Sequence, residues 1–240
     1  MPRRRARIGY QALASNATIT GNLGRDHSLN TDGLNVIADE TRAHLNAKHQ
    51  AREEALALTR EVIRLSANAI RAVHRREFDA AEGLLAKAKS NLQQTETGLS
   101  EHPDIFHAGF VHDAQKEFAE AHCSLALIAG RPLPAPAALG VMAGSYLNGL
   151  GETVGELRRH LLDSLRAGDI QHCEDCLAAM GDIYDVLVTM DYPEAVTSGL
   201  RRTADAMRGI LERTRGDYTM AYAQRQLEDR LREFEERLPK

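Results

Sequence analysis

Tryptophan is absent from this 240-residue sequence, and aromatic residues make up only 5% of it. Few side chains are therefore available to stack on nucleic-acid bases, so any preference for a base sequence should be weak. No run of about 18 apolar residues occurs, which argues against a membrane-spanning helix. The N-terminal arginines (Arg3, Arg4, Arg5 and Arg7) are not followed by an apolar stretch, which argues against a signal peptide.

Cysteine is also scarce, with three residues at positions 123, 173 and 176. An odd and small number argues against a disulfide framework and indicates a reducing compartment, so we expect a cytoplasmic protein. The formal net charge is only −4. A slightly acidic chain does not coat nucleic acid by bulk charge, so nucleic-acid binding would need local basic surface.

Two regions differ in composition. Residues 1–33 are rich in Asn, Thr, Ser and Gly without an apolar period, which predicts a disordered segment. Residues 34–238 show helical periodicity and no alternating β-type pattern, which predicts an all-α bundle of seven long amphipathic helices. The expected helices are 34–76, 78–99, 103–129, 135–168, 169–190, 193–215 and, after a break at Gly216 and Asp217, a last one from 218 to 238.

Four carboxylates stand in two pairs at helical spacing, Glu117 with Glu120 and Glu152 with Glu156. Each pair shares one side of its helix, so two adjacent helices could bring all four together. Clustered carboxylates without Cys or His ligands favour Mg²⁺ or Mn²⁺. The alternative is that both pairs lie on solvated helix faces.

A helical wheel places Glu152 and Glu156 opposite the leucine stripe of their helix. They should therefore face water, a partner subunit or a cavity enclosed by an assembly. Three glycines interrupt the same helix at positions 149, 151 and 155. Because each costs about 1 kcal/mol against Ala, they suggest a close backbone approach or room for a ligand.

Two further features have competing interpretations. The basic stripe on the first helix could contact phosphates, or it could be solvated and paired with acids; it comprises Arg60, Arg64, Arg71, His74 and Arg75. Arg201 and Arg202 form a weaker case of the same kind. His172, Cys173 and Cys176 suggest zinc, but a single Cys-x-x-Cys pair is more typical of small buried residues.

Four stretches together resemble the translin superfamily, which includes Translin and Trax: REVIRLSANAIRAVHR, GFVHDAQKEFAEA, YLNGLGETVGELRR and DYPEAVTSGLRRTADAMRGILERTRGD. The similarity runs from about residue 34 to about 231 and is closest to prokaryotic, especially archaeal, members. It implies a seven-helix fold and a hollow, roughly octameric shell that binds single-stranded RNA or DNA.

The resemblance also implies a catalytic role for the acidic residues. Trax-like members carry Glu-x-x-Glu on one helix and Asp-x-x-x-Glu on another, and these acids bind Mg²⁺ and cut single-stranded RNA. Glu117, Glu120 and Glu156 match this pattern, and Glu152 stands where the pattern has Asp. The longer side chain keeps the charge but puts the ion geometry in doubt.

We therefore expect a homo-oligomer that binds single-stranded RNA, with single-stranded DNA as a second candidate ligand. Mg²⁺ or Mn²⁺ held by the four glutamates would activate water for endonucleolytic cleavage and stabilise the leaving oxygen. One alternative is a nucleic-acid-binding shell without catalysis. Another is a helical scaffold subunit that neither binds nor cuts RNA.

Overall fold

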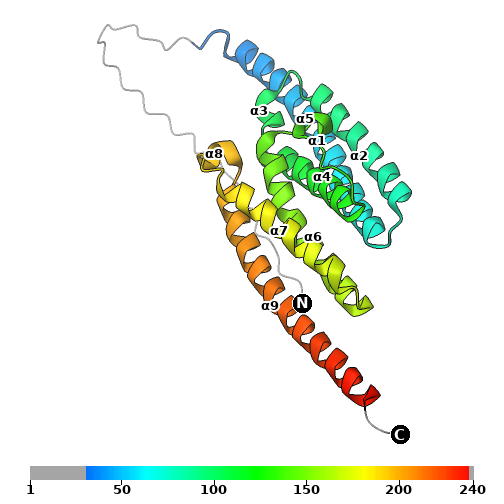
Figure 1. Ribbon diagram of the computed structural model, residues 1–240. Coiled ribbons are helices and arrows are strands. Elements are labelled where there is room, and N and C mark those ends of the chain that lie inside the picture. Colours follow the sequence, from blue (N-terminus) through cyan, green and yellow to red (C-terminus); the bar gives the residue numbers. More distant parts are fainter. Residues whose placement is uncertain (1–30, 238–240) are drawn as a thin grey trace, which may run out of the picture. The chain divides into compact units, whose positions relative to one another are not determined.

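The structure is a computed structural model that describes residues 31–237, and within this range every regular element is a helix (Figure 1). The all-α prediction is confirmed. The elements are α1 (Leu34–His74), α2 (Phe78–Gly98), α3 (Pro103–Phe106), α4 (Gly109–Ile128), α5 (Pro136–Leu139), α6 (Ala143–Ala167), α7 (Ile170–Val188), α8 (Glu194–Thr197) and α9 (Leu200–Glu236). Residues 1–30 of the segment predicted to be disordered lie outside the described range.

The chain divides into two units at Arg42 and Ala43. The first unit contributes residues 31–42 to the described range, and these are helical from Leu34. The second unit, from Ala43 onward, holds the buried core and all the residues discussed below. Across residues 31–237, none of the helices is both long and apolar enough to cross a membrane.

The helix boundaries differ from the prediction at three joints: the expected helix 103–129 is divided at His107 and Ala108 into α3 and α4, and left-handed backbone marks the other two joints. Gly140, with φ of 73°, separates the one-turn α5 from α6, so the expected helix 135–168 is divided. Ser198 and Gly199, with φ of 53° and 90°, separate the one-turn α8 from α9. Because left-handed backbone cannot continue an α-helix, the chain turns at these positions.

The predicted break at Gly216 and Asp217 is wrong, because α9 runs through both residues. Glycine at φ < 0 weakens a helix interior by about 1 kcal/mol but does not end it. Six long helices and three one-turn helices therefore occupy residues 31–237, in place of seven long ones. The start of α7 was predicted correctly, since the Asp169 side chain accepts a hydrogen bond from the backbone N–H of His172 (3.1 Å).

Helix α6 is the centre of the second unit, where it packs against α4, α7 and α9 (Figure 1). The largest fully buried side chains around it include Phe118, Leu161, Met180, Leu187 and Met207. Such a helix is covered on more than one face. Several of its polar side chains, such as Asn148 and Thr153, are therefore buried against other helices.

Of the glycines at positions 149, 151 and 155 in α6, the first two mark close contacts with neighbouring helices. A Cβ at Gly149 would lie 2.5 Å from the carbonyl oxygen of Lys116 and 2.9 Å from the backbone nitrogen of Glu120 on α4. A Cβ at Gly151 would lie 2.5 Å from Cγ2 of Thr203 on α9. The predicted close backbone approach is confirmed at these two positions, whereas nothing lies within 4 Å of a Cβ at Gly155.

Candidate metal site

Three of the four predicted carboxylates meet where α4 and α6 touch. Glu117 and Glu120 come from α4 and Glu152 comes from α6, and each offers an oxygen within 4.8 Å of the other two. The absence of a side chain at Gly149 allows this approach, because it lets the backbone of α4 lie directly against α6. The site is therefore a consequence of helix packing and not of a loop.

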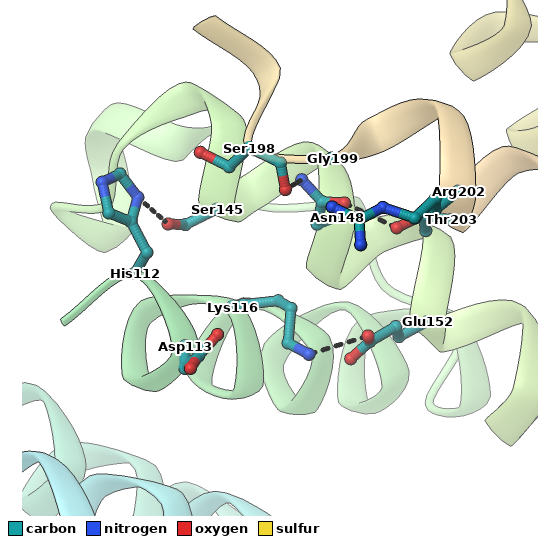
Figure 2. Close-up of a pocket in the computed structure, with 10 residues that line it drawn as sticks. All are labelled: His112, Asp113, Lys116, Ser145, Asn148, Glu152, Ser198, Gly199, Arg202 and Thr203. Carbon is teal, nitrogen blue, oxygen red and sulfur yellow. Dashed lines mark hydrogen bonds and ion pairs between the residues drawn. The ribbon is translucent and has the colours of Figure 1, made fainter. Parts of the chain in front are cut away.

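Lys116 is a member of this cluster that the sequence did not suggest. Its Nζ lies 2.8 Å from Oε1 of Glu152 (Figure 2). It also lies 3.7 Å from Oε1 of Glu117. Burial disfavours its charge, but the hydrogen bond to Glu152 and the surrounding acids raise the pKa of Lys116 overall. The ammonium thus offsets part of the negative charge between the two helices.

The pKa of Glu120 responds to burial and to the negative charge of its neighbours. Burial, followed by the charges of Glu117, Glu152 and Glu156, raises the pKa of this carboxyl to about 8. Burial likewise raises the pKa of Glu117. A divalent cation in contact with these oxygens would oppose both shifts, since it favours the ionised carboxylates.

Glu156 lies outside this group of three and pairs with His74 of α1. The His74 Nε2 is 2.5 Å from Oε2 of Glu156, and this hydrogen bond lowers the pKa of the carboxyl. The His74 side chain is 4% exposed and is occupied by this contact, and its predicted contact with phosphate stays a prediction. Its Nδ1 is buried and has no hydrogen-bond partner within residues 31–237.

Glu152 and Glu156 remain partly exposed, at 36% and 24% of their side-chain surface, and Glu152 lines two pockets. Both side chains face neighbouring helices, Glu152 toward α4 and Glu156 toward α1. The helical wheel did not reveal these contacts because the second buried face of α6 consists of small or polar residues such as Gly149 and Thr153. The Thr153 hydroxyl donates to the carbonyl of Gly149 at 2.9 Å, so it satisfies its polarity within the helix.

The cluster borders two pockets that share Glu152, Arg202 and Thr203. One has a volume of about 300 Å³, and Figure 2 shows its lining residues His112, Asp113, Lys116, Ser145, Asn148, Glu152, Ser198, Gly199, Arg202 and Thr203. The other, of about 440 Å³, is lined by Glu120, Gly151, Glu152, Arg202, Thr203, Ala206, Met207 and Ile210. A ligand can therefore reach the acids from both sides of Glu152.

Asn148 holds the wall of the first pocket together. Its Nδ2 donates to the carbonyl oxygens of Gly144 and Thr197, both at 2.8 Å, and its Oδ1 accepts from the Thr203 hydroxyl at 2.6 Å. These bonds attach α6 to the turn between α8 and α9. They thereby fix the start of α9, which carries Arg202 into the pocket.

The four arginines of the predicted basic stripe are exposed: Arg60, Arg64 and Arg71 on α1, and Arg75 directly after its end. Arg64 pairs with Glu61, and Arg75 pairs with Glu77. Exposed pairs of this kind are weak, and a phosphate can displace the acid. Nucleic-acid contact by these four side chains stays a prediction.

These features define an all-helical protein that holds a carboxylate cluster between two central helices. No protein-family model matches the chain. The structure of AfC3PO with duplex RNA is 33% identical, covers 79% of this chain and 98% of that one, and has a TM-score of 0.71. The crystal structure of AfC3PO alone is 34% identical with a TM-score of 0.72 and the same coverage. The chain belongs to the translin superfamily, of which the C3PO proteins are members.

Two further relatives agree with this family. An uncharacterised protein of Methanocaldococcus jannaschii is 31% identical over 188 residues, which are 78% of this chain and 81% of that protein. The structure of apo-NeC3PO is 18% identical, covers 81% of this chain and 99% of that one, and has a TM-score of 0.65. At that identity the likeness to NeC3PO supports the fold alone.

Proposed function

We propose that this protein binds RNA and cleaves it as a Mg²⁺-dependent endoribonuclease, with Mn²⁺ as the substitute ion. The observation that carries the proposal is the convergence of Glu117, Glu120 and Glu152 within 4.8 Å at the border of two pockets. Carboxylate oxygens are the ligands that both ions prefer. The raised pKa of Glu120 supports the same site, because burial and then the neighbouring acids disfavour its charge in the absence of a cation.

Each residue of the cluster has a separate role in this proposal. Glu117, Glu120 and Glu152 would hold the ion, and Glu156 would add negative charge from the next turn of α6. The bound ion would supply Lewis-acid activation of water and of the phosphate. Lys116 would offset the charge of the phosphate, because its Nζ lies in the same pocket beside Glu152.

The pocket walls offer donors for a phosphodiester backbone. Arg202 enters the first pocket from α9, while His112 lies opposite with its Nδ1 3.1 Å from the Ser145 hydroxyl (Figure 2). Cationic and hydroxyl groups of this kind position phosphates without reading bases. The duplex RNA bound by AfC3PO supports RNA as the ligand class here. Single-stranded RNA is our expected substrate, and single-stranded DNA is a further candidate.

The test is an end-labelled RNA incubated with the full chain and Mg²⁺, then with EDTA. Glu120→Gln should abolish cleavage and preserve binding, because it removes a ligand charge with little change in shape. Glu101→Gln, at an exposed position, should change neither. Unchanged cleavage by Glu120→Gln would remove the acidic cluster from the mechanism. Parallel single-stranded RNA, duplex RNA and single-stranded DNA substrates would identify the preferred strand.

One observation favours a second function, a nucleic-acid-binding protein without catalysis. Lys116 already provides a cation among the acids, so the cluster can be stable without a metal ion. In that case RNA binding should decrease with salt but stay unchanged on addition of Mg²⁺ or EDTA. The absence of cleavage with every divalent ion would support this function over the nuclease.

A homo-oligomer is part of the same proposal. The second half of α9 exposes Met220, Leu227, Leu231 and Phe234, each between 53% and 76% exposed. Spacings of seven, four and three residues place these side chains on one helical stripe. Apolar stripes of this kind mark contacts with another protein surface, here a second copy of the chain.

A further inference from the structure

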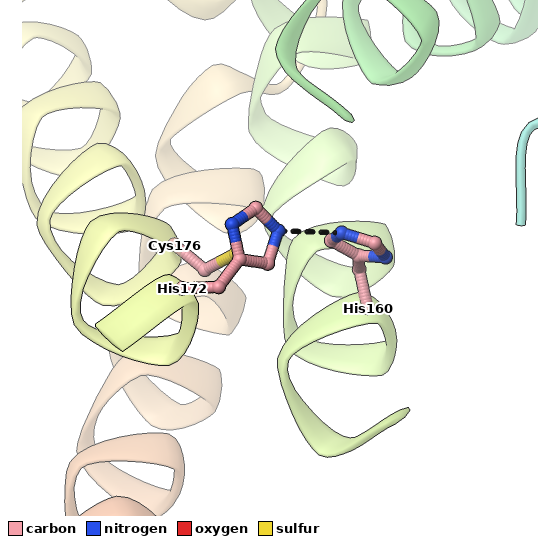
Figure 3. Close-up of side chains that lie close together, drawn as sticks. All are labelled: His160, His172 and Cys176. Atoms are coloured by element: carbon pink, nitrogen blue, oxygen red, sulfur yellow. Dashed lines mark hydrogen bonds between the residues drawn. The ribbon is translucent and has the colours of Figure 1, made fainter. Parts of the chain in front are cut away.

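A second cluster of ligand side chains lies at the other end of α6, and it contains nitrogen and sulfur instead of oxygen. His160 comes from α6, and His172 and Cys176 come from the first two turns of α7 (Figure 3). Their ligand atoms all lie within 4.8 Å of one another. None of these residues takes part in the acidic site.

The local fold brings the three side chains together. Helices α6 and α7 are joined by a tight turn at Gly168, whose φ is 79°, and they pack side by side. His172 and Cys176 are four residues apart, so they occupy one face of α7. The Asp169 cap fixes the first turn of that helix through the backbone N–H of His172. The ligands are therefore placed by two packed helices.

The contact between the two imidazoles is informative. Nε2 of His160 and Nε2 of His172 lie 2.8 Å apart, so two nitrogens that can each bind a metal face the same point (Figure 3). In the absence of an ion, one nitrogen must donate a proton to the other. His160 and Cys176 are each only 6% exposed, so both ligands are shielded from water.

The imidazole of His160 is not protonated at neutral pH. Burial, followed by the charge of His172, lowers the pKa of His160 to about 4, so its imidazole is neutral at neutral pH. Burial raises the pKa of the Cys176 thiol to about 11, with nearby Cys173 and acids contributing in the same direction. Cys176 thus keeps its proton until a metal ion displaces it.

The sequence pattern had pointed to a different pair. In the motif Cys173-x-x-Cys176, the Cys173 Sγ donates to the carbonyl oxygens of Asp169 (3.0 Å) and Leu161 (3.5 Å). Cys173 is therefore satisfied within the core and is not a member of the cluster. His160, twelve residues before His172, supplies the third ligand instead.

We propose that His160, His172 and Cys176 bind one Zn²⁺ ion, which links the end of α6 to the start of α7. Two imidazoles and a thiolate suit Zn²⁺ and exclude Mg²⁺, which requires oxygen ligands. Tetrahedral ligands on zinc lie roughly 3.3–3.6 Å apart, given Zn–N of about 2.0–2.1 Å and Zn–S of about 2.3 Å. The two nitrogens need to separate by only about 0.5 Å, a small rotation of either ring. Three protein ligands leave the fourth position to water or another ligand.

This zinc site would stabilise the helix that carries the acids. His160 follows Glu156 by one turn on α6, and the rings of His74 and His160 lie 6.4 Å apart. An ion joining α6 to α7 constrains the α6–α7 hairpin in the native state only, so binding adds to folding stability. The inference does not depend on the nuclease activity.

The experiment uses the full chain stripped of metal and titrated with Co²⁺ as a spectroscopic probe for Zn²⁺. One equivalent should bind and produce a thiolate-to-cobalt charge-transfer band, and Zn²⁺ should displace it while Mg²⁺ should not. Cys176→Ser should lose the band, whereas Cys173→Ser should keep it, because the Cys173 thiol lies outside the cluster.

A second variant keeps the test decisive if Cys176→Ser fails to fold. His172 is partly exposed, so His172→Asn should fold with native circular dichroism and still lose the zinc-dependent rise in Tm. Absence of saturable Co²⁺ binding would overturn the proposal, leaving a histidine–histidine hydrogen bond beside a buried thiol. An identical charge-transfer band in wild type and Cys176→Ser would also overturn it.

Discussion

Glu120 is the residue on which the acidic site depends most, because it is the most buried of the four acids. It is 9% exposed, and its carboxylate has no cation in direct contact among those recorded within residues 31–237. A buried carboxyl among like charges binds its proton more tightly in the folded chain than in the unfolded chain. The stability of the protein should therefore respond to pH through this group.

The first prediction concerns this pH dependence without metal. The pKa of Glu120 rises from 4.5 to about 8 on folding, so its contribution is fully present below 4.5 and is lost as pH rises toward 8. One pKa unit corresponds to about 1.4 kcal/mol, so the loss is on the order of a few kcal/mol. Urea unfolding in EDTA between pH 5 and pH 9 measures it.

Two controls belong to this measurement. Glu120→Gln should flatten the pH dependence because the amide does not titrate, whereas exposed Glu101→Gln should keep it. Adding Mg²⁺ at pH 9 should restore stability to the wild type only. An equally steep profile in Glu120→Gln would show that another group causes the pH response.

The second prediction separates Lys116 from the acids. Lys116→Met removes the ammonium that lies 2.8 Å from Glu152, so Mn²⁺ should bind about tenfold more tightly. This gain in binding free energy is smaller than the few kcal/mol expected for the interaction of two unit charges about 4 Å apart. RNA binding should weaken, since a cation is lost from the pocket. Calorimetric titration of Mn²⁺ measures the effect. Lys87→Met, at an exposed site, is the control. Unchanged Mn²⁺ affinity in Lys116→Met would contradict competition between the Lys116 ammonium and the metal ion for the acids.

Residue identity in the acidic cluster was largely predictable, but its partners were not. The spacing of Glu117 and Glu120, and of Glu152 and Glu156, predicted two pairs, and the structure brings three of the four together. The contact of Glu156 with His74 spans 82 positions in the chain. No local pattern encodes such a contact, because it depends on how α1 packs against α6.

At the scale of helices, the contact between α4 and α6 positions the site, and Gly149 allows that contact. A Cβ at this position would meet backbone atoms of Lys116 and Glu120, which cannot move independently of α4. By contrast, nothing lies within 4 Å of a Cβ at Gly155, one and a half turns along the same helix. The two glycines therefore form a matched pair for mutation.

The third prediction uses this pair. Gly149→Ala should destabilise the fold by about 1–3 kcal/mol through overpacking, and it should weaken Mn²⁺ binding because the helices separate. Gly155→Ala should stabilise the fold by about 0.5–1 kcal/mol, since alanine favours a helix interior. Urea unfolding of both variants gives the comparison. Equal effects of the two substitutions would mean that the α4–α6 distance does not determine the site.

Sequence periodicity predicted the long helices well and the joints less well. The apolar positions Val62, Leu65, Ala69 and Val73 recur at helical spacing in α1, and all four are buried. The joint at Ser198 and Gly199 was missed because Ser gives no signal for positive φ. The false break at Gly216 shows the converse, since glycine permits a turn but does not impose one.

At the scale of the whole molecule, the second half of α9 carries an apolar stripe that is not buried within a single chain. The buried residues of α9 are Leu200, Met207, Leu211 and Thr214, and all precede Arg215. Beyond that position the apolar side chains of the stripe defined above are exposed to solvent. A soluble monomer rarely exposes such a stripe, which supports the proposed contact with a second copy of the chain.

The fourth prediction tests this assembly. Leu227→Glu places a charge at the centre of the stripe and should lower the mass measured by light scattering, because an apolar contact between copies cannot bury an unpaired carboxylate. Gln226→Glu adds the same charge one position away, on a different side of the helix, and should leave the mass unchanged. The folded helix content should be equal in both, since the stripe does not pack against the rest of its own chain. If the wild type is a monomer, or if both variants dissociate equally, the stripe is not the contact between copies.

RNA binding measured on the dissociated Leu227→Glu variant would show whether one chain suffices to bind RNA, because the pockets beside Glu152 are formed by α4, α6 and α9 of a single chain.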